Sequence, residues 1–286
     1  MVTARVIAEP ARLEASLELA IERLAQQSMP IAMAEMLHHH GDVLQIELPY
    51  GDPLTVRRIL ADCFSPCDVL VAADEIAVPH LLVSDMDSTI IGQECIDELA
   101  DYAGIKPQIA MITERAMRGE LDFATALHER VWLLKDLEEQ AITECLRDRI
   151  RPNSGAKQMV AALKAKGCRT VLVTGGFHHF ADVVGRDLGF DRVVANRLAI
   201  AEGRLTGRLV GGISDAATKA RVLKEERESL GEGAITLALG DGANDAEMLS
   251  AATYGIAYHG KPAAVAVSGG SIDLGALGSV LRLLDV

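Results

Sequence analysis

The stretch Asp85-Met86-Asp87-Ser88-Thr89 follows an apolar run, from Val78 to Val83, that only Pro79 and His80 interrupt. Such a run is typical of a buried strand, and open α/β sheets place their chemistry at the carboxyl ends of their strands. Alternate residues of an extended chain point the same way, so Asp85 and Asp87 can address one reacting group. Two carboxylates so close need a cation, a proton or a substrate to offset their repulsion. The same residues could also form only a turn or a helix N-cap.

Two further predicted strands end in residues suited to an anion or a metal. The strand Thr170–Val173 continues into Thr174-Gly175-Gly176, where bare glycines let backbone N–H groups approach an anion. A simple glycine-rich turn explains that stretch equally well. The strand Thr236–Leu239 leads into Gly240-Asp241-Gly242-Ala243-Asn244-Asp245. These carboxylates and the amide favour Mg²⁺ over a dinucleotide, because Asp245 stands where a dinucleotide fingerprint has its last glycine.

Strands and helices alternate from Leu81 onward, except between residues 93 and 150. That interval has no convincing strand, and its predicted helices are Glu94–Ala103, Pro107–Arg118, Phe123–Leu134 and Leu137–Ile150. The alternation predicts an α/β fold with a three-layer, Rossmann-like parallel sheet. We therefore expect a core at residues 80–92 and 151–286 and a helical cap, residues 93–150, inserted after the first core strand. Lys219 is expected to begin a core helix, Lys219–Ser229, and taken alone it is an ordinary surface lysine.

Residues 1–79, the N-terminal unit, follow a β-α-β-β-α-β plan. Gly41-Asp42 separates the two central strands, Ile31–His38 and Val43–Leu48, as a hairpin. This order predicts an α+β, ferredoxin-type domain and resembles the ACT domains that sense amino acids. Ala8-Glu9-Pro10 stands where a ligand-binding glycine turn would be expected, so we favour a structural or dimerising role, giving a homodimer, over sensing. His38-His39-His40 could bind a metal, but a polar strand end is the preferred interpretation.

The composition restricts the class of partner. The chain has 286 residues, 49% of them hydrophobic, and a formal net charge of −13. Such an acidic surface argues against nucleic acids and anionic membranes as partners, whereas a small phosphorylated substrate remains possible if a metal offsets the repulsion. The longest stretch without charged residues, Met248–Gly260, is too short to span a bilayer, and the N-terminus has no apolar signal region. Five scattered cysteines fit reduced thiols, so we expect a cytoplasmic protein.

Taken in order, four pieces of the chain resemble the motifs of the haloacid dehalogenase superfamily of phosphohydrolases. They are Asp85–Thr89, Thr174–Gly176, Lys219 and Gly240–Asp245. Asp87, two residues after the first aspartate, marks the phosphatases of that superfamily. Within it, the chain is most similar to the phosphoserine phosphatase family. That likeness extends over residues 80–286 and includes Glu94, Ala116-Met117, Phe123, Arg130-Val131, Thr174-Gly175-Gly176-Phe177 and Ala195-Asn196-Arg197-Leu198.

The resemblance implies a mechanism. Asp85 is the expected nucleophile, which forms an aspartyl-phosphate, and Asp87 the general acid and base. Mg²⁺ is expected on Asp85, on the backbone carbonyl of Asp87 and on Asp241, with Asp245 shaping the surroundings. The substrate residues that the resemblance implies are Thr174, Gly175, Lys219 and Asn244 near the phosphoryl group, and Glu94, Arg130, Met117 and Phe123 in the cap. Without the resemblance, these four cap residues read as ordinary helix residues.

The implied reaction is Mg²⁺-dependent hydrolysis of O-phospho-L-serine, the last step of serine biosynthesis. Two alternatives stay open at this stage. The same chemistry could act on another small phosphomonoester, or transfer the phosphoryl group to an acceptor such as homoserine. A third reading, from a different class, makes the N-terminal unit the working part of an amino-acid sensor or assembly module.

Overall fold

The structure, a computed structural model, describes the backbone of residues 1–286 and every side chain except that of Met117. The N-terminal unit has four antiparallel strands in the order β2-β3-β1-β4, which is a ferredoxin-like arrangement. The predicted hairpin closes with Leu37 N donating to Val43 O at 2.9 Å. The elements are β1 (Val2–Ala8), η1 (Pro10–Arg12), α1 (Leu13–Gln26), β2 (Met33–Met36), β3 (Leu44–Leu48), α2 (Pro53–Phe64) and β4 (Cys67–Ala72).

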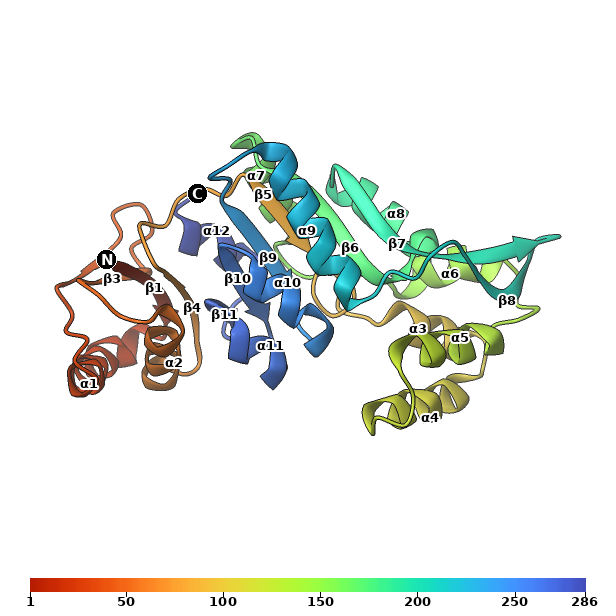
Figure 1. Ribbon diagram of the computed structural model, residues 1–286, viewed down its shortest axis with the longest axis horizontal. Coiled ribbons are helices and arrows are strands. Elements are labelled where there is room, and N and C mark those ends of the chain that lie inside the picture. The colour runs from red at the N-terminus through yellow and green to blue at the C-terminus, as the bar shows by residue number, and fades with distance from the viewer.

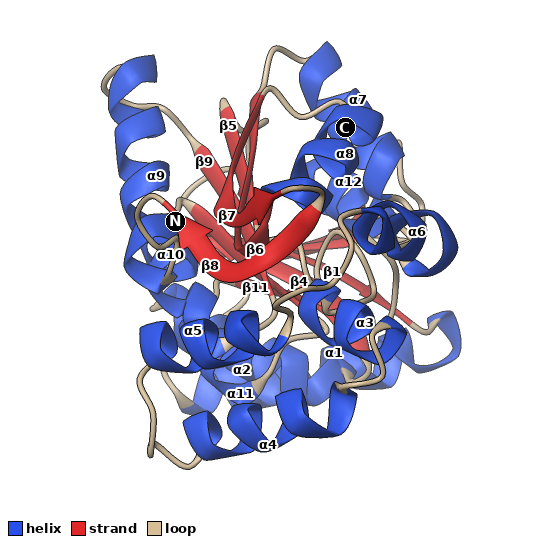
Figure 2. Cartoon of the chain, turned by 90° about the vertical axis from the view of Figure 1, so that its right-hand side faces the viewer, coloured by secondary structure: helices blue, strands red, loops and turns tan.

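The core is a mixed, mostly parallel sheet with helices on both faces, which confirms the predicted α/β class. Its strands are β5 (Leu81–Ser84), β6 (Arg169–Phe177), β7 (Arg192–Ala201), β8 (Arg204–Val210), β9 (Thr236–Gly240), β10 (Tyr254–Tyr258) and β11 (Gly270–Ile272). Its helices are α7 (Ala156–Ala165), α8 (His178–Leu188), α9 (Ala216–Leu230), η2 (Ala243–Asp245), α10 (Ala246–Ala251), α11 (Pro262–Val267) and α12 (Gly278–Leu284). Figure 2 shows α9 and α10 on one side of the strands and α7, α8 and α12 on the other.

The order of the parallel strands explains where the site forms. β5 lies between β6 and β9, parallel to both, so the carboxyl ends of these three strands meet at one edge. Leu81, Val83 and Ala238 are fully buried beneath that edge. Burial of a strand on both faces favours the continuous apolar runs seen in the sequence. The polar stretches that follow β5 and β9 are therefore brought together with Thr174–Gly176, which the structure places inside the carboxyl end of β6 and not after it.

The N-terminal unit continues the core sheet. β4 pairs with β11 in an antiparallel ladder, so that strands from both ends of the chain share one sheet (Figure 1). Asp68 of β4 is fully buried, and its Oδ1 accepts hydrogen bonds from the N–H groups of Asp273, Leu274 and Gly275 at 2.8–3.0 Å. A buried carboxylate needs such donors, so this clamp ties the loop after β11 to the N-terminal unit.

The cap consists of helices between β5 and α7, as predicted, and Figure 1 shows it on the side of the core away from the N-terminal unit. Ile91 and Pro152, at the two ends of the cap, form an antiparallel bridge. The helices are α3 (Cys95–Tyr102), α4 (Lys106–Met117), α5 (Phe123–Leu133) and α6 (Gln140–Arg149). No helix in the described part of the chain is both long and apolar enough to cross a membrane.

Candidate active site

Asp85 lies buried directly after β5. Its backbone N–H donates to Leu239 O of the neighbouring β9 at 2.9 Å, so the sheet ladder fixes the position of its backbone. Met86 O then accepts from the N–H groups of Ile90 and Ile91, at 2.8 and 3.0 Å. The turn between them requires a left-handed Ser88, with φ 58°. The first motif is therefore a tight turn, and both Asp85 and Asp87 stand on it.

Lys219 places a buried ammonium group against Asp85. Its Nζ is 2.6 Å from Asp85 Oδ1 and 2.6 Å from Asp245 Oδ1, and the side chain is 1% exposed. Burial works to lower the pKa of Lys219, but Asp85 and Asp245 outweigh burial and raise this pKa. An ammonium group has three donors, so one stays free for a phosphoryl oxygen. The prediction that Lys219 begins its helix is wrong, because Asp215 caps α9 by accepting from Thr218 N at 2.9 Å and the helix begins at Ala216.

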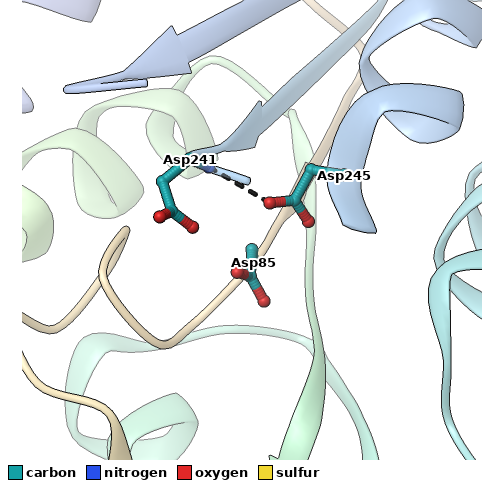
Figure 3. Close-up of side chains that lie close together, drawn as sticks. All are labelled: Asp85, Asp241 and Asp245. Carbon is teal, nitrogen blue, oxygen red and sulfur yellow. Dashed lines mark hydrogen bonds between the residues drawn. The ribbon is translucent and has the colours of Figure 1, made fainter. Parts of the chain in front are cut away.

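The loop after β9 is closed by Asp245. Its Oδ2 accepts from the N–H groups of Asp241 and Gly242 at 3.1 and 3.0 Å, the first of which Figure 3 marks. A β-carbon on Gly240 would lie 2.5 Å from Asp245 Cβ, so only glycine fits there. Asn244 folds back over Gly242, and a β-carbon at Gly242 would lie 2.4 Å from Asn244 Oδ1. The loop therefore leaves the carboxylate of Asp241 facing Asp85.

The carboxylates of Asp85, Asp241 and Asp245 form one acidic cluster. Single oxygens of the three lie within 4.8 Å of one another, and all three side chains are buried (Figure 3). Burial raises the pKa of Asp85 to about 7, although Lys219 opposes the shift. Both Asp245 oxygens are already engaged, so Asp85 and Asp241 are the residues with oxygens left for a cation. This hard, oxygen-rich donor set with excess negative charge fits Mg²⁺.

Asp87 sits between the cluster and the cap. Burial, together with the nearby charges of Glu94 and Asp85, raises the pKa of Asp87 well above its ordinary value. Its Oδ1 has no hydrogen-bond partner among the described residues. A β-carbon on Gly176 would lie 3.0 Å from Asp87 Oδ2, so the carboxyl faces the glycines near the carboxyl end of β6. A raised pKa favours the protonated form of a carboxyl, which suits a group that donates a proton.

The glycine stretch Thr174-Gly175-Gly176 lies beside the same cluster, inside the last part of β6, where the pairing with β7 shifts register between Val173 and Phe177. Thr174 is buried, and its hydroxyl oxygen accepts from Gly176 N at 2.9 Å, which leaves the hydroxyl hydrogen free to donate. Two residues that were not predicted as site residues, Ser214 and Asn196, hydrogen-bond to the backbone of this stretch. Ser214 donates its hydroxyl to Thr174 O at 2.9 Å, and Asn196 Nδ2 donates to Gly175 O at 2.8 Å. The only sequence signal for Asn196 was its place in the family-like stretch that contains it.

Three of the four predicted cap residues can be placed, and they differ in how closely they contact the residues of the core. A β-carbon on Gly175 would lie 3.3 Å from the ring of Phe123, so this cap residue lies directly over Gly175 of β6. Glu94 accepts from Ser88 Oγ at 2.8 Å, and partial burial of its carboxyl raises its pKa. Burial lowers the pKa of Arg130, although the nearby charges of Asp97 and Glu94 oppose the shift. The side chain of Met117 lies outside the described part of the structure.

Lys261, at the end of β10, is a charged neighbour of the cluster that the sequence analysis missed. Its Nζ is 2.9 Å from Asp241 Oδ2, and its backbone N–H donates to Asp241 O at 2.7 Å. Its side chain is 65% exposed, and it comes from a fourth strand end beside the three already considered. That position, shortly after the strand Tyr254–Tyr258, is the signal that could have found it.

Comparisons with known proteins match the chain to one family of hydrolases. The sequence model of the haloacid dehalogenase-like hydrolases matches residues 82–250, more than half of the chain. A phosphoserine phosphatase of Archaeoglobus fulgidus is 45% identical over 209 residues, which cover 71% of this chain and 60% of that protein. One from Idiomarina loihiensis is 45% identical over 208 residues, which cover 71% of this chain and 93% of that protein.

The fold agrees over a longer stretch. The crystal structure of a probable phosphoserine phosphatase from Vibrio cholerae, in its unliganded form, matches with a TM-score of 0.76 and 30% sequence identity, covering 99% of this chain and 86% of that one. The chain therefore belongs to the haloacid dehalogenase-like hydrolases and, within them, to the phosphoserine phosphatase family.

Proposed function

We propose that this protein hydrolyses O-phospho-L-serine to L-serine and phosphate through an aspartyl-phosphate on Asp85. The observation that carries the proposal is the pairing of Asp85 with Lys219, 2.6 Å away, beside an Asp87 whose pKa burial raises. A carboxylate held against an ammonium group can approach a phosphate dianion. A neighbouring carboxyl that keeps its proton can protonate the leaving oxygen.

The reaction takes two displacements. In the first, a carboxylate oxygen of Asp85 forms a bond to phosphorus while the bond from phosphorus to the serine oxygen breaks, and that oxygen takes the proton of Asp87. In the second, Asp87 removes a proton from water, whose oxygen attacks phosphorus, and the bond to Asp85 breaks to release phosphate. Asp87 returns to its protonated state, so that one carboxyl serves both steps.

Residues of the core are proposed to bind the phosphoryl group. The free donors of Lys219 and Thr174 are available for its oxygens, and the N–H of Gly175 and the amide of Asn244 are proposed to add further contacts. Mg²⁺ would be held by Asp85, Asp241 and the backbone carbonyl of Asp87, and when bound it neutralises charge on the phosphoryl group. The acidic cluster supports this assignment, because its carboxylates outnumber the buried ammonium of Lys219.

The cap is proposed to select the amino acid. Glu94 carries the charge to bind the serine ammonium, and Arg130 the charge to bind its carboxylate. Asp97 and then Glu94 oppose the lowering of the Arg130 pKa by burial, which supports placing Arg130 and Glu94 in the same part of the site. Phe123, over Gly175, would exclude water from the reacting phosphoryl group, and Met117 is proposed to extend the same wall.

Three remaining assignments are part of the proposal. We propose three domains, which are residues 1–79, residues 80–92 with 151–286, and residues 93–150. A cytoplasmic location is supported by five cysteines that are free and buried. A homodimer through the N-terminal unit stays a prediction, which sedimentation of the full chain would test.

The test is phosphate release from O-phospho-L-serine with Mg²⁺ and with a chelator. Asp85→Asn removes the nucleophile but keeps the size of the side chain, so it should abolish turnover while the variant still unfolds cooperatively. A panel of other small phosphomonoesters, with and without homoserine as acceptor, checks the substrate. An active Asp85→Asn protein would refute the mechanism, and preference for another phosphomonoester would refute the substrate.

A further inference from the structure

A buried arginine of the N-terminal unit contacts the core near the site. Arg57 on α2 is buried, and its Nη2 donates to Val265 O of α11 at 2.6 Å. Its Nε has no hydrogen-bond partner among the described residues, so the guanidinium is only partly compensated. Burying a charge in this way is costly, whereas a cation near the last carbonyls of a helix is favourable. Arg57 therefore binds α11 at its carboxyl end.

At the amino end of α11, Lys261 contacts Asp241. Lys261 is the residue before the helix, and it contacts Asp241 twice, through its backbone N–H at 2.7 Å and through its Nζ at 2.9 Å. The Arg57 contact at Val265 is four residues beyond Lys261, about 6 Å at 1.5 Å per residue. Figures 1 and 2 both show α2 and α11 close together. One short element thus connects Arg57 to the acidic cluster.

The contact with Lys261 affects which oxygen of Asp241 faces a metal. Lys261 binds Oδ2, which leaves Oδ1 for a cation. The ammonium of Lys261 would also repel that cation, but its side chain is 65% exposed, and water and salt screen such repulsion. We therefore expect the orienting hydrogen bond to outweigh the repulsion.

We propose that Arg57 is a positioning residue for metal binding, which holds α11 so that Lys261 orients the carboxylate of Asp241. This inference rests on the proposed role of Asp241 as a magnesium ligand. It gives the N-terminal unit a part in the chemistry of the core, although that unit contributes no residue to the acidic cluster.

The experiment titrates the full chain with Mg²⁺ in a calorimeter, without substrate. Arg57→Ala should raise the Kd for Mg²⁺ about 3- to 10-fold, less than the 10- to 100-fold typical when a direct partner of a metal ligand is removed. At saturating Mg²⁺ its kcat should stay within about twofold of the unmodified chain. Arg57→Lys, which keeps a donor and a charge, should recover part of the affinity.

Two arginines provide matched controls. Arg58→Ala alters an exposed neighbour on the same helix. Arg5→Ala removes another buried contact between the N-terminal unit and the core, because Arg5 Nη1 donates to Leu283 O of α12 at 2.9 Å. Neither should change the Kd for Mg²⁺. An increase with Arg5→Ala equal to that with Arg57→Ala would overturn the proposal, because loosening of the whole unit would then explain both.

A double variant tests the route. If Arg57 acts through Lys261, Arg57→Ala should raise the Kd less in a Lys261→Ala background than in the unmodified chain. An equal increase in both backgrounds, or no increase from Arg57→Ala at all, would overturn the proposal. The proposed function fails separately, because it fails if the unmodified chain itself binds no Mg²⁺.

Discussion

Lys219 and Asp245 form a buried ion pair, with Nζ 2.6 Å from Oδ1, between α9 and the loop after β9. The other oxygen of Asp245 accepts the N–H groups of Asp241 and Gly242. Asp245 therefore fixes both the ammonium beside the nucleophile and the backbone of the other acidic residue. It does so without an oxygen to spare for a metal.

Two substitutions of Asp245 separate the effect of its hydrogen bonds on stability from the effect of its charge on activity. Asp245→Ala leaves Lys219 with one partner and two N–H groups without any, so the free energy of unfolding should fall by about 3–5 kcal/mol. Asp245→Asn keeps an acceptor for the N–H groups and should lose less stability, while phosphate release still falls sharply because Lys219 shifts toward Asp85. Denaturant unfolding and steady-state kinetics measure the two effects. Equal losses of stability in both variants would contradict this division.

The contact between Phe123 and Gly175 predicts that an activity loss caused at Gly175 can be partly restored by a smaller side chain at residue 123. A β-carbon on Gly175 would stand 3.3 Å from the ring, and the backbone of Gly175 is not left-handed, so Gly175→Ala should crowd the cap without straining the chain. We expect kcat/KM for O-phospho-L-serine to fall about 3- to 10-fold, a cost on the order of 1 kcal/mol. Phe123→Leu in the same chain should restore part of it. No recovery in the double variant would show that the alanine acts on phosphate binding directly.

The acidic cluster predicts opposite effects of pH with and without metal. The pKa of Asp85 rises from 3.8 in the unfolded chain to about 7 in the folded one, so the folded state binds more protons and stability falls as pH rises through this window. Mg²⁺ needs the ionised carboxylate, so the gain in Tm on adding Mg²⁺ should be larger at pH 8 than at pH 6. Thermal unfolding in EDTA and in Mg²⁺ measures both. The metal-free trend should weaken in Asp85→Asn, and an unchanged trend would assign it to other groups.

Glu94 predicts a substrate-dependent defect. If its carboxylate binds the serine ammonium, Glu94→Gln should raise KM for O-phospho-L-serine about 10- to 100-fold, the range of a charged hydrogen bond of 1.5–3 kcal/mol. KM for ethyl phosphate, which has no ammonium group, should change little. Glu114→Gln, on an exposed glutamate of the same cap, is the matched control. An equal rise for both substrates would place Glu94 in phosphate or metal binding instead.

Local pattern was enough to predict much of the fold and part of the site. Apolar runs located β5, β6 and β9, and the polar residues after each could be expected at one sheet edge because the strands are parallel. Asp85, Thr174 and Asp241 followed from that rule. Lys219 did not, because a lysine on a helix carries no sign of being buried until its partners from two other elements are known.

The elements that the sequence analysis missed depend on contacts between distant parts of the chain. β11 has three residues, and its ladders to β4 and β10 hold it in the sheet, since Gly270-Ser271-Ile272 has little strand preference of its own. Lys261 precedes a proline at a helix start and reads as an exposed loop residue. The start of α9 differs from the prediction for a local reason, because Asp215 and Thr218, three residues apart, form a helix cap that the sequence already contains.

The ladder between β4 and β11 also decides where the sheet ends. A chain cut before Leu81 would leave β11 with one bare edge, and unpaired edges of this kind recruit strands from other molecules. With the N-terminal unit present, the terminal strand is instead β2, which has four residues and carries the exposed charge of Glu35. Short, charged edges are the ones that resist aggregation. The first 79 residues thus cover the edge of the sheet that β11 would otherwise expose. We expect them in this way to keep the phosphatase core soluble, although its active site lies several strands away.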